Sequence, residues 1–196
     1  AIDNAPTVQA DAIGSGSASF DGISDIISFG SDSTIDNIWT SGGTFAAWVY
    51  PETDGEGDEG LGQGRIASKE NADIGKGWTL HVESESSSTV EARFTVGWDT
   101  TDGNWVTTAR ELTCNTWNHI AVTYDSDSTS NNAIIYVNGV SVALTETTSP
   151  AGSLESDASR NFVIGNNRAT SLTKTFDGFI CQAGMWSAVL TQAQIQ

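Results

Sequence analysis

The chain has few cysteines, few prolines and no long apolar run, and these scarcities exclude several classes of protein. Its 196 residues include two Cys and three Pro. Cys114 and Cys181 are too few to staple a small disulfide-rich domain, and they lack the close spacing of a zinc site. We expect them either to form one disulfide or to lie as two buried thiols. No hydrophobic run reaches the ~18 residues of a membrane-spanning helix, so we predict no membrane insertion.

Positive charge is also scarce. The chain carries 8 Lys and Arg against 25 Asp and Glu, which gives a formal net charge of -17. A field of this sign repels phosphate backbones and anionic lipid headgroups, which argues against nucleic acid or a membrane surface as partner. Divalent cations and neutral glycans fit it better. Alternatively, the acidity only keeps a secreted or saline-exposed protein soluble.

Sustained helical periodicity and internal repeats are absent, whereas short strand-like segments are frequent. These segments are rich in β-branched and aromatic residues and alternate with turn residues. We expect strands within residues 20–29, 44–50, 65–69, 78–83, 90–98, 105–108, 120–124, 134–137, 140–144, 162–165 and 179–186. A content of 38% hydrophobic residues, with 7 Trp, suffices for two sheets to bury their inner faces. The pattern predicts an all-β, antiparallel two-sheet β-sandwich or jelly roll.

The pattern is that of a single domain. Residues 1–17 are small and polar, and we expect a linker or N-terminal arm there, followed by one domain over residues 18–196. Asn138-Gly139 is the strongest hairpin signal, because both residues of such a turn adopt positive φ. Thr191 and Gln194 have the spacing of a capping box, which predicts a short C-terminal helical turn. Ala1 stands in place of an initiator Met, as expected of a processed or excised piece.

Several segments occur in an order that resembles the laminin-G-like branch of the concanavalin A-like lectin and glucanase superfamily. The most informative is Trp-Asn-His-Ile-Ala-Val-Thr-Tyr-Asp at residues 117–125. The others are Phe20-Asp21-Gly22, residues 44–51, residues 65–69, Tyr136-Val137-Asn138-Gly139, Ile164-Gly165, Phe176-Asp177-Gly178, Trp186, Leu190-Thr191 and Ile195. Each piece alone is weak, but the ordered set covers residues 19–196 and is specific for the fold.

The resemblance implies a concanavalin A-like or laminin-G-like jelly roll whose N- and C-terminal strands lie close together, frequently with a structural Ca²⁺. Asp21, Asp25 and Asp177 fall at the two ends of the pattern, where those strands should meet. Ca²⁺ takes about six to eight oxygen ligands, often carboxylates and turn carbonyls. We therefore predict a structural calcium site at these three residues. The alternative is that Asp21-Gly22 and Asp177-Gly178 are only turn formers.

A candidate glycan site lies between residues 98 and 110, where aromatic and polar side chains gather. Sugar rings present apolar faces, so glycan sites pair an aromatic ring with carboxylate, amide or guanidinium groups. The candidate ligand-binding residues are Trp98, Asp99, Asp102, Asn104, Trp105 and Arg110. Alternatively, Trp98 packs in the core and Trp105 covers it. Trp39 is a second candidate for an exposed aromatic contact.

Two other features suggest metal or catalytic chemistry but have simpler explanations. The acidic loop at residues 52–60 departs from an EF-hand at Glu59 and Arg65, where that loop needs Gly and Glu. We therefore favour a solvated loop over a cation site at the rim. His119 lies on an expected strand and should have a structural role. His81 lies on another strand, and neither histidine has the spacing of a metal site.

A pair of catalytic carboxylates is not evident. Glycoside hydrolysis needs two carboxylates ~5–5.5 Å apart for retention or ~6.5–9.5 Å apart for inversion. Glucanases of this superfamily carry Glu, Asp and Glu alternating on one strand. Glu83-Ser84-Glu85 is the nearest match, lacks the Asp, and is expected to be a solvated strand end. Arg110-Glu111-Leu112 faintly resembles a polysaccharide-lyase strand, without its accompanying motifs. We therefore expect no catalytic residues.

The sequence thus favours a non-catalytic recognition module that binds a glycan or a glycoprotein surface, with a structural Ca²⁺. It would act in an extracellular setting or on a virion. The alternative is a structural or adhesive domain of a larger extracellular, virion or phage surface assembly, with other chains as partners. A glycan hydrolase or lyase is a third hypothesis.

Overall fold

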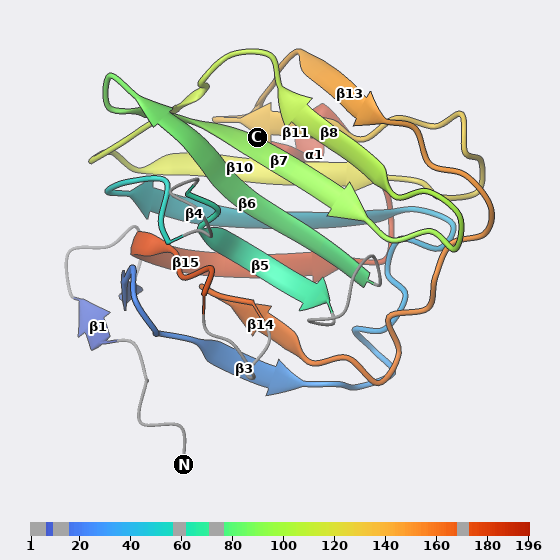
Figure 1. Cartoon of the computed structure of the whole chain (residues 1–196), viewed down its shortest axis with the longest axis horizontal. Coiled ribbons are helices and arrows are strands. Elements are labelled where there is room, and N and C mark those ends of the chain that lie inside the picture. The colour runs from blue at the N-terminus through green and yellow to red at the C-terminus, as the bar shows by residue number, and fades with distance from the viewer. Residues whose placement is uncertain (1–6, 10–15, 57–61, 71–76, 168–172) are drawn as a thin grey trace.

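The computed structural model describes residues 7–9, 16–56, 62–70, 77–167 and 173–196. In this part the chain forms two antiparallel sheets stacked face to face, with one short helix (Figure 1). The predicted all-β, two-sheet jelly-roll fold is confirmed. Cys114 and Cys181 are both buried and do not form a disulfide, which is the second of the two arrangements expected from the sequence.

The seven-stranded sheet has the order β1-β2-β15-β4-β10-β11-β12. Its strands are β1 (Thr7–Gln9), β2 (Ser17–Asp21), β4 (Gly43–Pro51), β10 (Asn118–Tyr124), β11 (Ile134–Val137), β12 (Val140–Ser141) and β15 (Asp177–Trp186). β15 lies between β2 and β4, so strands from the two ends of the domain are neighbours, as the resemblance implied. β1 pairs with β2, so residues 7–9 of the predicted arm belong to this sheet. Residues 1–6 and 10–15 of that arm lie outside the described residues.

The eight-stranded sheet has the order β13-β8-β7-β6-β5-β14-β3, and β9 pairs with β7. Its strands are β3 (Ile27–Gly30), β5 (Arg65–Glu70), β6 (Gly77–Ser86), β7 (Thr89–Val96), β8 (Gly103–Thr107), β9 (Leu112–Thr113), β13 (Leu144–Thr148) and β14 (Phe162–Ile164). The predicted turn at Asp21-Gly22 separates the two layers, because β2 ends at Asp21 and β3 begins at Ile27 in the other sheet.

The core fills the space between the sheets with alternate residues of each strand. Along β7 every second residue is buried, and Phe94 and Val96 are among them, as the two-residue period predicts. The connection before β4 adds Trp39, which is 1% exposed and packs against Trp78 with ring centroids 5.2 Å apart. The suggestion that Trp39 is an exposed aromatic contact is therefore wrong.

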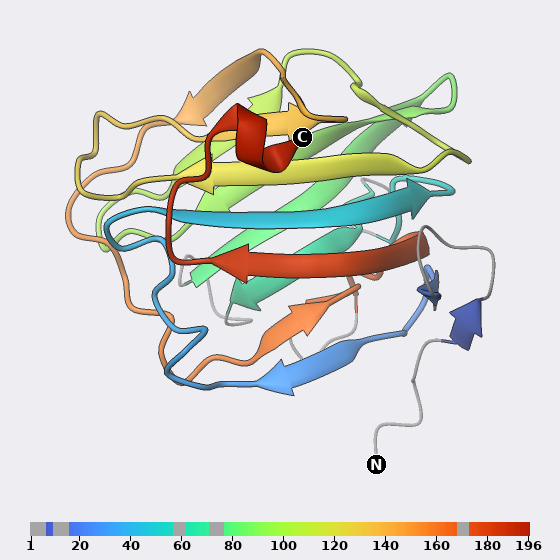
Figure 2. The same ribbon diagram turned by 180° about the vertical axis from the view of Figure 1, so that it is seen from behind.

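The outer faces of the two sheets differ. On the seven-stranded sheet, Ile195 of the helix α1 (Gln192–Ile195) packs against Ala46, Ala121 and Tyr136, so α1 covers part of that face (Figure 2). The Gln194 side-chain oxygen accepts a hydrogen bond from the N–H of its N-cap residue at 2.9 Å, as the predicted capping box requires. No helix in the described part of the chain is long and apolar enough to cross a membrane. The outer face of the eight-stranded sheet instead carries the cavity described below.

The predicted hairpin between β11 and β12 is present. Asn138 and Gly139 both have positive φ, at 51° and 77°. These values are those of a tight two-residue hairpin turn that follows the twist of its strands.

Candidate functional site

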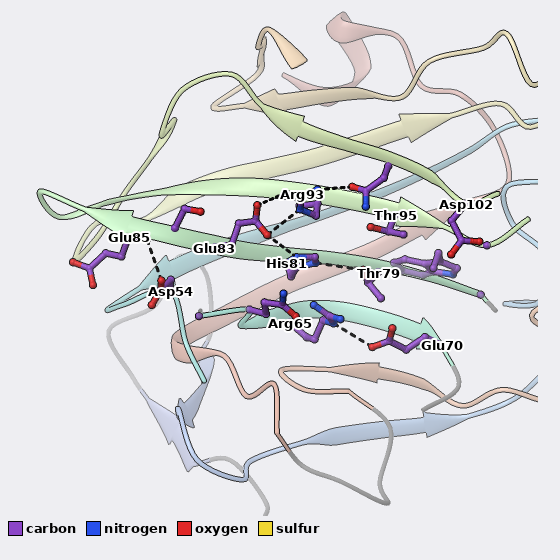
Figure 3. A pocket seen from close by; sticks show the side chains of 17 residues that line it. Asp54, Arg65, Glu70, Thr79, His81, Glu83, Glu85, Arg93, Thr95 and Asp102 are labelled. Atoms are coloured by element: carbon purple, nitrogen blue, oxygen red, sulfur yellow. Dashed lines mark hydrogen bonds and ion pairs between the residues drawn. The ribbon is translucent and has the colours of Figure 1, made fainter. Parts of the chain in front are cut away.

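A cavity of about 640 Å³ opens on the outer face of the eight-stranded sheet, over β5, β6, β7 and β8 (Figure 3). We call it the outer cavity. Its floor follows from strand alternation, because Leu80 and Val82 of β6 point into the core. Thr79, His81 and Glu83 of the same strand therefore point the other way and line the cavity. All three are nonetheless buried, because the surrounding protein atoms cover most of their surface.

Arg65 reaches the outer cavity because of a β-bulge. The register of β5 against β6 shifts between Arg65 and Ala67, so that Ile66 and Ala67 both face the core. In an unbroken strand Arg65 would share the inward face with Ala67. The extra residue of the bulge turns the Arg65 side chain outward, where it lines the cavity opposite His81.

The centre of the floor is a hydrogen-bonded group of His81, Glu83 and Arg93 (Figure 3). Glu83 Oε1 accepts from Arg93 Nη2 at 2.6 Å, and Glu83 Oε2 accepts from Arg93 Nε at 2.9 Å. His81 Nε2 lies 3.2 Å from Glu83 Oε2, and His81 Nδ1 lies 3.3 Å from the Thr79 hydroxyl. This bidentate pair and its imidazole neighbour fix one another in position.

The pKa values of this group assign its protonation. Burial, together with the positive charge of Arg65, lowers the pKa of His81 to about 3, although Glu83 acts in the opposite direction. Burial acts to raise the pKa of Glu83, but hydrogen bonds from His81 and Arg93 outweigh it and lower the pKa to about 2. At neutral pH His81 is therefore uncharged and Glu83 is ionised. A neutral His81 that donates from Nε2 to Glu83 leaves Nδ1 to accept from Thr79.

Arg65 has fewer partners than Arg93. Its Nε donates to Glu70 Oε1 at 3.1 Å. Its Nη1 is shielded from solvent and has no hydrogen-bond acceptor among the described residues. Arg65 is only 7% exposed, so this guanidinium nitrogen is a buried donor that the described residues leave unsatisfied.

A second row of polar side chains lies beside the central group. Thr79, Thr95 and Asn104 are register neighbours across β6, β7 and β8, and all line the cavity. The Asn104 side-chain oxygen accepts from Arg93 Nη1 at 2.8 Å, which leaves its NH₂ group as a donor for a ligand. Arg93 is thus held by both Glu83 and Asn104.

Of the six residues predicted to bind a ligand, the outer cavity brings together two, Asp102 and Asn104. Trp98 and Trp105 are 6% and 1% exposed and belong to the core, so the aromatic platform predicted from them is not formed. The alternation of β8 explains this result, because Trp105 faces inward between the outward-facing Asn104 and Val106.

The other two predicted residues lie outside the cavity lining. Asp99 is exposed, and its Oδ1 accepts from the backbone N–H of Ser153 at 2.9 Å. Arg110 is exposed, donates to the backbone oxygen of Ser84, and lies 3.8 Å from Glu91. Asp99 therefore links two loops, and Arg110 links its loop to β6 and β7.

The prediction that Glu83-Ser84-Glu85 forms a solvated strand end is wrong for Glu83. Glu83 is 8% exposed and bonded to Arg93, whereas Glu85 is exposed. A register shift follows Glu83, and Ser84 has a φ of 59°, so the strand bends there. The signal that was missed is Thr-x-His-x-Glu on β6, which places three polar side chains opposite two apolar ones.

Asp21, Asp25 and Asp177 lie at the meeting of β2 and β15, where Asp21 pairs with Asp177 in the register. Asp21 Oδ1 accepts backbone N–H groups from Ile23, Ser24 and Asp25 at 2.9, 2.9 and 3.2 Å. Burial acts to raise the pKa of Asp21, but these backbone donors hold it below its ordinary value. The Asp21 carboxylate therefore organises the turn that follows β2.

The side chains of Asp25 and Asp177 also accept hydrogen bonds. Asp25 Oδ2 accepts from the backbone N–H of Asp21 at 3.0 Å, and Asp177 Oδ2 accepts from the Thr53 hydroxyl at 2.8 Å. Burial and the charge of Asp21 raise the pKa of Asp25. In the described part of the chain no group of three or more His, Cys, Asp or Glu side chains could hold a metal ion. The three residues therefore do not fit a three-carboxylate calcium site, and Ca²⁺ binding here stays a prediction.

The acidic loop and His119 are also located by the structure. Asp54 lies at the rim of the outer cavity, where its Oδ2 accepts from the backbone N–H of Glu85 at 3.0 Å. The Glu56 carboxylate lies 3.3 Å from the Thr175 hydroxyl, and residues 57–60 of the loop lie outside the described residues. His119 lies on β10, half-buried, with its ring centroid 5.3 Å from that of Trp48.

A family model described as the concanavalin A-like lectin/glucanases superfamily, of the laminin-G type, matches residues 21–196. The chain belongs to this superfamily. The family named from the sequence is thus confirmed. Comparison with curated protein sequences gives no match.

Solved structures with the same fold include two sugar-binding domains. One is the CBM40 module of the Ruminococcus gnavus IT-sialidase bound to α2,3-sialyllactose, with a TM-score of 0.60, 12% identity and coverage of 91% of this chain and 95% of that chain. The other is domain 4 of AbnA, an extracellular arabinanase from Geobacillus stearothermophilus, in complex with arabinotriose. It has a TM-score of 0.57, 18% identity and coverage of 99% and 82% of the two chains.

A third similar structure is the enzymatically active domain of tailspike protein 2 from bacteriophage CBA120. It has a TM-score of 0.61, 12% identity and coverage of 94% of this chain but only 27% of that chain. At such identities each of the three likenesses shows a shared fold.

Proposed function

We propose that the chain is a non-catalytic carbohydrate-binding module and that the outer cavity is its binding site. The observation that carries this proposal is the floor of the cavity, where Glu83, Arg93 and Asn104 hold one another in place on three strands. Polar groups fixed on rigid strands bind a ligand without first losing conformational entropy. The similar sugar-binding domains of the sialidase and the arabinanase support this assignment.

The outer cavity is suited to hydrogen bonding with hydroxyl groups more than to stacking on a sugar ring. Its volume of about 640 Å³ falls within the usual range of small-ligand sites, about 300–1,000 Å³. Trp78 touches the cavity but is 1% exposed, so it offers little ring surface. Thr95 and the free NH₂ group of Asn104 provide donors and acceptors that match sugar hydroxyls.

The state of Glu83 supports a role in binding over one in catalysis. A glycosidase needs one protonated carboxyl group and one carboxylate beside the scissile bond. Glu83, with its pKa lowered to about 2, holds no proton at neutral pH. Both of its oxygens also accept hydrogen bonds, from Arg93 and His81, which reduces its ability to act as a nucleophile. A structural Ca²⁺ is not required for any part of this proposal.

A steric block of the floor tests the site. Thr95 is half-buried in the middle of the floor, and Thr113 on β9 is exposed and outside the cavity lining. In a glycan array and in calorimetry with its best ligands, we expect Thr95→Phe to lose glycan binding and Thr113→Phe to retain it. If the wild-type chain binds neither neutral nor acidic glycans, the proposal is refuted. Equal binding by both variants would place the site elsewhere.

We place this module outside a cell or on a virion surface, because the similar arabinanase is described as extracellular and the tailspike belongs to a phage. The tailspike likeness also favours a second candidate function, that of a structural domain in a larger surface assembly. Native mass spectrometry distinguishes the two. A symmetric oligomer would support the assembly role, whereas a stable monomer would disfavour it.

A further inference from the structure

The charges that line the outer cavity are unevenly placed. Arg65, His81 and Arg93 form a row across β5, β6 and β7, because Arg65 pairs with His81 and His81 pairs with Arg93 in the sheet register. This row crosses the floor of the cavity (Figure 3). The two positive groups of the site, Arg65 and Arg93, are therefore central and lie on either side of the uncharged His81.

The carboxylates of the cavity are either neutralised or peripheral. Glu83 is bonded to Arg93 through both oxygens, and Glu70 pairs with Arg65 at 3.1 Å. Asp54 and Asp102 each accept a backbone N–H and lie toward opposite ends of the cavity (Figure 3). Glu85, the fifth carboxylate of the lining, is exposed and lies at the same end as Asp54. The acidic surplus of the whole chain is therefore not found in the middle of this site, where Glu70 and Glu83 are each paired with an arginine.

Arg65 Nη1 is the unsatisfied group in this row. A buried donor without an acceptor costs about 1–3 kcal/mol, and more when it is charged. Arg93 avoids this cost through Glu83 and Asn104, whereas Arg65 Nε donates to Glu70 and its Nη1 has no acceptor among the described residues. Because Arg65 lines the cavity, an oxygen of a ligand there would supply the acceptor that the described residues lack.

We infer that the outer cavity selects acidic saccharides, and that Arg65 pairs with the carboxylate of a sugar such as a uronic or sialic acid. The inference rests on the proposed function and names its ligand class. A carboxylate matches Arg65 better than a hydroxyl does, because a charge-assisted hydrogen bond is about twice as strong as a neutral one. The hydroxyl groups of the same sugar would meet Thr95 and Asn104 in the neighbouring row.

The test compares matched sugars on the whole wild-type chain by calorimetry. The probes are 3′-sialyllactose and trigalacturonate, each paired with its carboxyl-reduced counterpart, together with neutral arabinotriose. We expect at least one acidic probe to bind, and its carboxyl-reduced form to bind about tenfold more weakly or worse. Because no substitution is involved, this comparison does not depend on the folding of a variant.

Substitutions then locate the effect. Arg65→Gln should weaken the acidic probe by about tenfold or more, whereas Arg110→Gln should leave it unchanged, because Arg110 is exposed and outside the cavity lining. Arg65→Lys should restore part of the binding, because it keeps the charge but loses the planar fork. A thermal melt of each variant confirms that it is folded.

The outcomes separate this inference from the proposed function. If a carboxyl-reduced or neutral sugar binds as tightly as the acidic one, and Thr95→Phe abolishes that binding, the cavity is a glycan site and acid selectivity is overturned. If Arg65→Gln, once shown to be folded, binds the acidic probe as the wild type does, the role of Arg65 is overturned. If no sugar of either class binds, the proposed function fails together with the inference.

Discussion

Lys69 and Arg65 are two buried cations on β5, four residues apart, and their surroundings are opposite. Lys69 Nζ donates to Asp36 Oδ1, Asp157 Oδ1 and the Asp157 backbone oxygen at 2.6, 2.9 and 2.7 Å. An ammonium group has three N–H donors, so Lys69 is fully satisfied. Arg65 has Glu70 at 3.1 Å and an Nη1 with no acceptor in the described structure.

The bulge in β5 accounts for this difference. In a regular strand two residues four positions apart share a face. The shifted register between Arg65 and Ala67 sends Lys69 to the inner side, opposite the core residue Trp78, and Arg65 to the outer cavity, opposite His81. One strand therefore supplies a closed ion cluster that joins two distant loops and an open cation that faces a cavity. The contrast indicates that the number of hydrogen-bond acceptors around a buried cation distinguishes a structural cation from one that can bind a ligand.

The strongest test of the contrast is removal of each cation in turn. Lys69→Met should lower the free energy of unfolding by about 3–5 kcal/mol, because it leaves Asp36 and Asp157 without their buried partner. Arg65→Met should cost much less, because it removes an unsatisfied donor along with one ion pair. Urea denaturation followed by tryptophan fluorescence measures both.

The double substitution Lys69→Met with Asp157→Leu is the control for this experiment. Replacing a buried ion pair by apolar residues of similar size is often close to neutral, so it should recover part of the lost stability. Equal losses from Lys69→Met and Arg65→Met would mean that Arg65 is as much a structural cation as Lys69. The distinction between a closed and an open site would then be wrong.

A second test uses pH, because His81 lies next to Arg65 on the open side. The pKa of His81 is lowered to about 3 in the folded chain, against an ordinary value near 6.5, so below pH 6.5 the unfolded chain binds a proton that the folded chain does not. Stability should therefore be complete above pH 6.5 and fall as the pH decreases, by at most about 1.4 kcal/mol per pH unit for this one group. Urea denaturation at pH 7, 6 and 5 measures the slope.

The comparison variants for this slope are His81→Gln and His119→Gln. The folded-state pKa of His119 is also lowered by burial, but His119 is only half-buried and should contribute less. His81→Gln should therefore flatten the slope more than His119→Gln does. Glu83, whose pKa is lowered to about 2, adds its own loss of stability only below its ordinary value near 4.5. An unchanged slope in His81→Gln would show that His81 is not a buried neutral group.

The sequence predicted the fold far better than the site. The sandwich could be predicted because its signals are local or shared by the family. These signals are strand alternation, the Asn138-Gly139 turn and the ordered family segments. The bulge beside Arg65 was not, because a one-residue register shift depends on pairing with β6. The glycan platform was predicted from Trp98 and Trp105, but both side chains lie in the core. The sequence does not distinguish the two locations, because an aromatic residue suits a core and a glycan surface equally well.

The smallest expected effect concerns calcium at the meeting of β2 and β15, where the question is again whether polar groups are already satisfied. Asp21 Oδ1 accepts three backbone N–H groups, so a cation would gain little from that oxygen. We expect removal of divalent cations by EDTA to change the stability of the wild type by less than about 0.5 kcal/mol, the level of an ordinary surface change. Differential scanning calorimetry with and without added CaCl₂ measures the change.

The matched substitutions are Asp177→Asn and Asp127→Asn, the second being an exposed aspartate in the loop that follows β10. If CaCl₂ raises the melting temperature by several degrees in the wild type and in Asp127→Asn but not in Asp177→Asn, the family expectation of a structural calcium ion holds. In that case Asp177 Oδ1 and nearby carbonyl oxygens would have to complete the coordination, since Asp177 Oδ2 already accepts from Thr53. These aspartates would then belong with Arg65, as groups that await a ligand, and not with Lys69.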